Sequence, residues 1–151
     1  MKNLIKNIVQ NTQDQHNSMA SLALRVPTGI IFAAHGAQKL FGWFGGYGLQ
    51  GTAGWMESIG LAPGIPLALM AGGAEFFGGL ALLFGLFTRP AAFVLAITMA
   101  VAIFSVHLAN GLFMSNNGYE FGLALLAISV ALTFSGAGRF AIDNWLAKKL
   151  A

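Results

Sequence analysis

The chain of 151 residues is 56% hydrophobic and only 9% charged, carries a formal net charge of +3 and contains no cysteine. Its mean hydropathy of +0.70 is far above that of a soluble domain of this length, which favours an integral membrane protein. The absence of cysteine excludes disulfides, thiolate metal sites and thiol catalysis within the chain.

The first predicted element is a polar N-terminal arm over residues 1–19. It holds Lys2 and Lys6 but only a short apolar patch, so it lacks the apolar core and the cleavage site of a signal peptide. We expect this arm to be retained in the cytoplasm.

Four apolar stretches follow the arm, each near the roughly 20 residues that a helix needs to cross a bilayer. They are residues 20–41, 65–87, 90–109 and 119–137. The sequence therefore predicts an all-α fold, an integral membrane four-helix bundle that fills residues 20–137. Residues 138–151 would form a cytoplasmic amphipathic C-terminal tail.

The long connection between the first two predicted helices, residues 42–64, is rich in glycine. Its aromatic residues suit the headgroup region of a membrane; they are Trp43, Tyr47 and Trp55. Residues 52–59 predict a short outer helix that stops at Gly60 and lies over the bundle as a lid, with Trp55, Met56 and Ile59 on one side. The simpler interpretation is an interfacial anchor, although long loops are often functional.

The distribution of basic residues predicts the orientation. If both termini are cytoplasmic, seven of the eight Lys and Arg fall on the cytoplasmic side and only Lys39 falls opposite. The seven are Lys2, Lys6, Arg25, Arg89, Arg139, Lys148 and Lys149. The positive-inside rule then gives an N-in, C-in topology with residues 42–64 outside. The basic charge reflects topology in a lipid bilayer, and no nucleic-acid partner is expected.

Helical spacing assigns the polar residues within the apolar stretches to faces. The first helix carries one stripe of Arg25, Thr28, Phe32, His35 and Lys39. In the second helix, Glu75 shares a stripe with Ala68, Gly72, Gly79 and Leu82, whose small members predict close contact with a neighbouring helix.

The third and fourth helices each carry one polar stripe of the same predicted helix-contact type. His107 lies with Ala100, Phe104 and either Asn110 or Gly111, and Glu120 lies with Ala124, Ala127 and Ala131.

Depth along the four helices places five ionisable residues at the midplane or in the outer half of the membrane. They are His35, Lys39, Glu75, His107 and Glu120. An unpaired charge at the middle of a membrane helix costs about 2.5–3.5 kcal/mol, so we expect Glu75 either to be protonated or to pair with His35 or Lys39. The five side chains can converge on a polar pocket below residues 42–64, where a histidine can exchange protons.

Two other interpretations of this polar set stay open. The side chains can form a hydrogen-bonded network that only ties the helices together. Two histidines and two carboxylates also match metal ligands in helix bundles, but each candidate stands alone on its helix and no Glu-x-x-His pair occurs, so we expect no native metal.

Three motifs in this order resemble the DoxX family of small bacterial four-helix membrane proteins. They are RVPTGIIFAAHGAQKLFGWFGG at 25–46, GGAEFFGGLALLFGLFTRPAA at 72–92 and HLANGLFMSNNGYEFGLALLA at 107–127. The resemblance covers residues 20–137. It implies a multi-pass protein of the bacterial inner membrane that is associated with redox work, as a subunit of a membrane oxidoreductase with a redox partner protein or in quinone handling. It transfers no catalytic residue.

Two functional hypotheses follow from the residues and this resemblance. In the first, an outward-facing pocket binds a quinone or a similar amphipathic molecule. Its catalytic, proton-handling residues are Glu75, His35 and His107, and its ligand-binding residues are Arg25, Lys39, Asn110, Glu120 and Trp43. In the second, the protein is a non-catalytic assembly partner or a small-solute permease. Whether it turns over a substrate stays open, and a homo-oligomer fits both.

Overall fold

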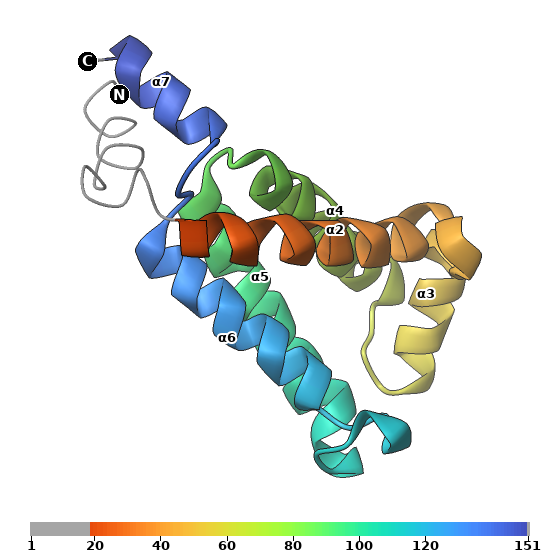
Figure 1. The fold of residues 1–151 in the computed structure, drawn as a ribbon. Coiled ribbons are helices and arrows are strands. Elements are labelled where there is room, and N and C mark those ends of the chain that lie inside the picture. The colour runs from red at the N-terminus through yellow and green to blue at the C-terminus, as the bar shows by residue number, and fades with distance from the viewer. Residues whose placement is uncertain (1–18, 151) are drawn as a thin grey trace.

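The computed structural model describes residues 19–150, and this part of the chain is mostly helical, with no strand (Figure 1). The predicted all-α fold is therefore confirmed for these residues. The elements are α2 (Met19–Phe41), η1 (Trp43–Gly45), α3 (Gly48–Ser58), α4 (Gly64–Phe84), α5 (Thr88–Ala102), η2 (Ile103–His107), η3 (Leu108–Asn110), η4 (Met114–Asn116), α6 (Glu120–Ser135) and α7 (Ile142–Leu150). The arm predicted over residues 1–19 lies outside the described residues, except for Met19.

Two segments of the described chain are long and apolar enough to cross a membrane, namely α4 and the continuous helical stretch Thr88–Asn110. Helix α6 is apolar but has only 16 residues. Helix α2 has 23 residues, and its polar content lowers its hydropathy. Length and composition thus identify two spanning candidates among residues 19–150, where the apolar stretches predicted four.

Helices α2 and α4 lie side by side and share the most extensive contact between elements of the fold (Figure 1). A Cβ atom at Gly36 would lie 2.3 Å from the backbone nitrogen of Phe76, and one at Gly79 would lie 2.3 Å from that of Ala33. Because glycine has no side chain, the two helix backbones touch at these positions. The stripe predicted around Glu75 is indeed the buried face of α4, whose buried residues are Gly64, Ala68, Gly72, Glu75, Gly79 and Leu82.

Helices α5 and α6 form a second pair, whose buried side chains complete the apolar core. The core contains Phe32, Leu82, Ala92, Leu95, Met99, Leu125 and Leu132. The contact stripe predicted for α6 is wrong, because Ala124, Ala127 and Ala131 are exposed while Leu125, Ser129 and Leu132 are buried. The larger leucines fill the space against α5, and the alanines face outward.

The contact stripe predicted around His107 is also wrong. Phe104 is 73% exposed, and His107 is only half-buried. The helix that begins at Thr88 widens into a π-turn over Ile103–His107 and then tightens into a 3-10 turn over Leu108–Asn110. These turns change the number of residues per turn, so regular α-helical spacing no longer assigns faces there.

The start of α2, the α4–α5 turn, the end of α6 and helix α7 all lie at one end of the molecule, which we call the α7 end (Figure 1). Buried Arg25 uses every donor of its guanidinium there. Nε donates to the carbonyl of Ala137 at 2.8 Å, and Nη1 donates to Leu82 and Leu83 at 3.0 and 2.7 Å. Nη2 donates to Arg139 and Phe140 at 2.9 and 2.8 Å. One side chain of α2 therefore ties the end of α4 to the turn that follows α6.

Asp143 joins α7 to the same end by capping α5. Its carboxylate accepts hydrogen bonds from the backbone N–H groups of Phe87 at 2.6 Å and Thr88 at 3.0 Å. Its own N–H donates to the carbonyl of Gly85 at 2.9 Å. The first N–H groups of a helix lack partners within the helix, so a carboxylate from a distant segment satisfies them here.

Candidate functional site at the α3 end

The opposite end of the molecule, which we call the α3 end, holds a buried ion pair. Glu75 of α4 is 4% exposed, and its Oε2 atom lies 2.5 Å from Nζ of Lys39 of α2. The Lys39 side chain is 25% exposed, so the pair has a buried acidic side and a more accessible basic side. Removing one partner of such a pair leaves an uncompensated charge, which is strongly destabilising in an apolar surrounding.

The close contact of α2 and α4 explains how the pair forms. A Cβ atom at Gly72, one turn before Glu75, would lie 3.2 Å from Cβ of Lys39. Because position 72 has no side chain, Lys39 can lie across α4 and reach the carboxylate. Within residues 19–150, the side chain of Glu75 makes one hydrogen bond, from Nζ of Lys39 to its Oε2 atom. The other carboxylate oxygen, Oε1, has no hydrogen-bond partner among these residues.

Helix α3 attaches to the ends of α2 and α4 beside this pair. Thr52 Oγ1 donates to the carbonyl of Lys39 at 3.2 Å, and Met56 packs in a small cluster with Ala53 and Ala68. Glu57 Oε1 accepts a hydrogen bond of 2.9 Å from the N–H of Gly64 at the start of α4. Three different contacts therefore hold α3 in place.

The short helix predicted over residues 52–59 is the second half of α3, and Gly60, with a φ of +85°, follows its end as predicted. The face predicted for it is only partly right. Met56 is buried, but Trp55 and Ile59 are 43% and 42% exposed. The packed face is made by Thr52, Ala53 and Met56 instead.

The inner faces of α2 and α6 become exposed at the same level toward the α3 end. On α2, Phe32 is 1% exposed, whereas His35, one turn further on, is exposed. On α6, Leu125 is 5% exposed and Phe121, one turn earlier, is 37% exposed. The ring centroids of His35 and Phe121 are 6.2 Å apart. The helices therefore separate just beyond Phe32 and Leu125, which belong to the same apolar core.

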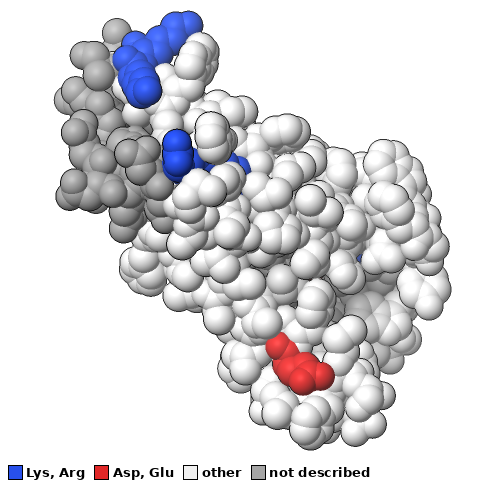
Figure 2. Space-filling view, in the orientation of Figure 1, with Lys and Arg blue, Asp and Glu red and all other residues white. Residues whose placement is uncertain are grey.

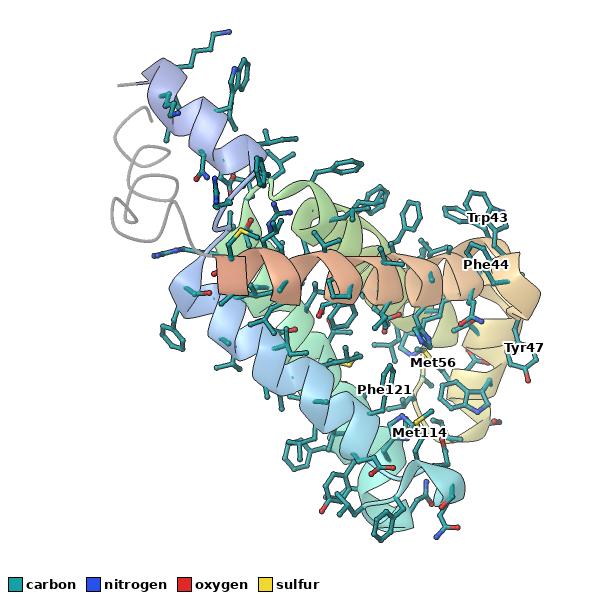
Figure 3. The ribbon with its side chains drawn as sticks, in the orientation of Figure 1. Trp43, Phe44, Tyr47, Met56, Met114 and Phe121 are labelled. Atoms are coloured by element: carbon teal, nitrogen blue, oxygen red, sulfur yellow. The ribbon has the colours of Figure 1, made fainter. Side chains whose placement is uncertain are left out.

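We call the resulting space the recess, bordered by His35, Met56, Met114 and Phe121. Figure 2 shows a hollow in the surface between α3 and the α5–α6 connection. Figure 3 shows the side chains of Met56 from α3, Met114 from that connection and Phe121 from α6 around the same space. Apolar walls with a few polar groups at one side are typical of sites for small amphipathic molecules.

His107, Asn110 and Glu120 shape the α5–α6 connection. His107 Nδ1 lies 2.9 Å from the carbonyl of Asn117, and Asn110 Nδ2 donates to the same carbonyl at 3.3 Å. Glu120 Oε1 accepts a hydrogen bond of 2.6 Å from the N–H of Met114. These three side chains therefore bond to the backbone of the connection. Of the five ionisable residues expected to converge, the structure brings together Lys39 and Glu75, and His35 lies nearby.

Two other predicted ligand-binding residues lie away from the recess. Arg25 is at the α7 end of α2, about 21 Å along the helix from Lys39 at 1.5 Å per residue. Trp43 is 55% exposed and packs on Phe41 with a centroid distance of 5.1 Å. Among residues 19–150, no group of three His, Cys, Asp or Glu side chains could hold a metal ion.

Sequence reasoning missed four residues that define the two ends. Phe121 follows the helical spacing of the buried residues of α6, and Met56 lies on the short helix predicted over residues 52–59. Helical periodicity could therefore have indicated both residues. Thr52 and Asp143 act through the backbone of distant segments, and helical spacing carries no signal for such contacts.

Comparison with known proteins places the chain among membrane proteins. The sequence model of the DoxX family matches residues 20–108. An uncharacterized protein of Haemophilus influenzae is 38% identical over 129 residues, which are 83% of this chain and 90% of the relative. The Bacillus subtilis protein named "Putative oxidoreductase CatD" is 37% identical over 86% of this chain and 89% of its own length. "Inner membrane protein YqjF" of Escherichia coli is 36% identical over 85% and 92%.

No solved structure matches the chain. The family match covers more than half of the 151 residues, and the three relatives align with more than four-fifths of them. The chain therefore belongs to the DoxX family of membrane proteins.

Proposed function

We propose that the protein is a multi-pass protein of the bacterial inner membrane whose recess binds a quinone or a similar small amphipathic molecule. The Lys39–Glu75 pair carries this proposal, because it places a partly accessible ammonium group and a buried carboxylate beside an apolar space. Charged residues within membrane-spanning helices usually belong to a functional site.

The proposal includes four membrane crossings with both termini in the cytoplasm, and the packing of the helices supports the number of crossings. Helix α2 lies along α4, which is itself a spanning candidate. The polar residues that lower the hydropathy of α2 include Ser21, Arg25 and Thr28, and all three are buried against other helices at 2% exposure or less. The face of α2 that would meet lipid is therefore less polar than its composition indicates. The name of the Escherichia coli relative supports the inner membrane as the location.

The recess offers a polar end and an apolar body to its ligand. Lys39 Nζ can donate to a quinone carbonyl, and Glu75 Oε1 can accept from the hydroxyl of the reduced form. His35, exposed nearby, can exchange protons near neutral pH. The thioethers of Met56 and Met114 and the ring of Phe121 suit a planar ring with an apolar tail.

The redox role in this proposal belongs to a complex. The chain contains no cysteine, so a partner protein or a bound group would supply the electrons. The name of the Bacillus subtilis relative supports a link to an oxidoreductase. Buried Phe32 lies at the inner end of the recess, which favours a closed binding pocket over a pathway through the membrane.

Equilibrium binding of decylubiquinone and menadione to the full chain in lipid nanodiscs tests the proposal. The Glu75→Gln variant keeps the size of the side chain and removes its charge. Glu57→Gln is the matched control because Glu57 is exposed and the amide oxygen of glutamine can still accept from the N–H of Gly64. Loss of one hydrogen bond to a charged group, worth about 1.5–3 kcal/mol, predicts binding weakened by roughly 10- to 100-fold in Glu75→Gln.

Three outcomes of this experiment count against the proposal. If the wild-type protein binds neither compound, the quinone class is wrong. If Glu75→Gln binds as wild type with an unchanged melting temperature, the carboxylate has no role in the site. If Glu57→Gln loses as much binding as Glu75→Gln, the effect is a general one of charge.

A further inference from the structure

The described part of the chain has a strongly uneven distribution of charge. Arg89, Arg139, Lys148 and Lys149 lie on or next to the α4–α5 turn and α7 at the α7 end. Figure 2 shows basic atoms gathered on α7 and beside it, while an acidic side chain lies at the far end of the same face. Among residues 19–150, Asp143 is the acidic residue of the α7 end, and it is 7% exposed and bonded to backbone N–H groups. The accessible charge at this end is therefore positive.

Exposed aromatic rings accompany these cations. Phe140 and Trp145 are 76% and 59% exposed. The guanidinium carbon of Arg139 lies 5.2 Å from the centroid of the Phe140 ring, and Nζ of Lys149 lies 5.0 Å from that of Trp145. Both distances are within the range of cation–π contact. Each ring thus has a cation held over its face.

Helix α7 has two different faces. Asp143 and Ala147, four residues apart, are buried. Ile142, Trp145 and Leu150 are 39%, 59% and 41% exposed, next to the exposed lysines of the last turn. An exposed apolar arc that adjoins Lys side chains is typical of a helix at a membrane interface.

We propose that α7 and the preceding turn at 139–140 form a docking surface for the headgroups of anionic phospholipids. Residues 136–141 alone separate α7 from the end of α6, so the surface sits at the edge of the membrane domain. The rings would enter the interfacial region, where Trp is enriched, and the cations would meet lipid phosphates. An acidic protein would satisfy the charges but would leave no reason for the exposed Phe140, Trp145 and Ile142.

The test is competitive lipid retention by the full chain purified in mild detergent. Phosphatidylglycerol and phosphatidylcholine with identical acyl chains are supplied at equal concentration, and the bound lipids are counted by native mass spectrometry. We expect wild type to retain phosphatidylglycerol preferentially. A basic residue near an anionic surface contributes about a fivefold preference, so Arg139→Gln, Lys148→Gln and Lys149→Gln combined should lower it by roughly 100-fold at low salt.

The controls separate a lipid site from loss of the fold. The three side chains are exposed, so the triple variant should melt as wild type does. The Lys148→Gln, Lys149→Gln pair provides a milder variant, and Lys148→Arg, Lys149→Arg should keep the preference because the charge is kept.

Equal retention of the two lipids by wild type would overturn the inference, as would an unchanged preference in the triple variant. Displacement of phosphatidylglycerol by polyglutamate at equal charge would overturn it in favour of an acidic protein partner.

Discussion

Replacing Arg25 by lysine should destabilise the protein while keeping its net charge. The guanidinium donates to five backbone carbonyls, whereas an ammonium group has three donors, so at least two acceptors lose their partner. A buried polar group without a partner costs about 1–3 kcal/mol, which gives ~2–6 kcal/mol for two. The carbonyl of Leu82 also accepts from the N–H of Gly85, which favours the lower half of this range.

Thermal unfolding of the purified protein in mild detergent measures this effect. A chain of this size loses about 2–4 °C of melting temperature per kcal/mol, so we expect Arg25→Lys to melt roughly 5–15 °C below wild type. Arg139→Lys is the matched control, since that side chain is exposed and surface substitutions change stability by about 0.5 kcal/mol or less. If the two variants melt together, the carbonyl contacts of Arg25 do not hold the α7 end, and our reasoning is wrong.

Two further substitutions test other parts of the fold. Asp143→Asn should lower stability by about 1–3 kcal/mol in the same assay, because it weakens the caps on Phe87 and Thr88; an unchanged melting temperature would show that the caps contribute little. Gly36→Ala should reduce the yield of folded protein, because its Cβ atom would collide with α4. Gly54→Ala, where nothing lies within 4 Å, should be tolerated, and equal yields of the two would contradict the close contact of α2 and α4.

Helical spacing predicted the buried face of α4 because this helix is regular and packs along α2 through glycines. The same reasoning failed for α6, where leucine fills the core and alanine faces outward. It also failed around His107, because a π-turn changes which residues share a face of the helix, and no pattern in this single sequence predicts that turn. Small residues therefore indicate a helix contact only where the facing helix is also lined with small residues.

The polar site was predictable in part. A carboxylate and an ammonium group within apolar helices must find partners, and Glu75 and Lys39 do pair. The role of Arg25 was not predictable, since its acceptors are backbone carbonyls, which every residue carries. The same holds for His107 and Glu120, whose partners are groups in the backbone of the α5–α6 connection.

The five backbone carbonyls that accept hydrogen bonds from Arg25 are synthesised long after Arg25 itself. Arg25 precedes its acceptor Ala137 by 112 residues, so at about 5–20 residues per second the ribosome needs roughly 6–22 s to supply that acceptor. During this interval α2 carries a guanidinium whose acceptors in the turn after α6 do not yet exist. A premature stop codon between Arg25 and Ala137 makes that state permanent, because the product then carries the guanidinium without its acceptors in the turn after α6.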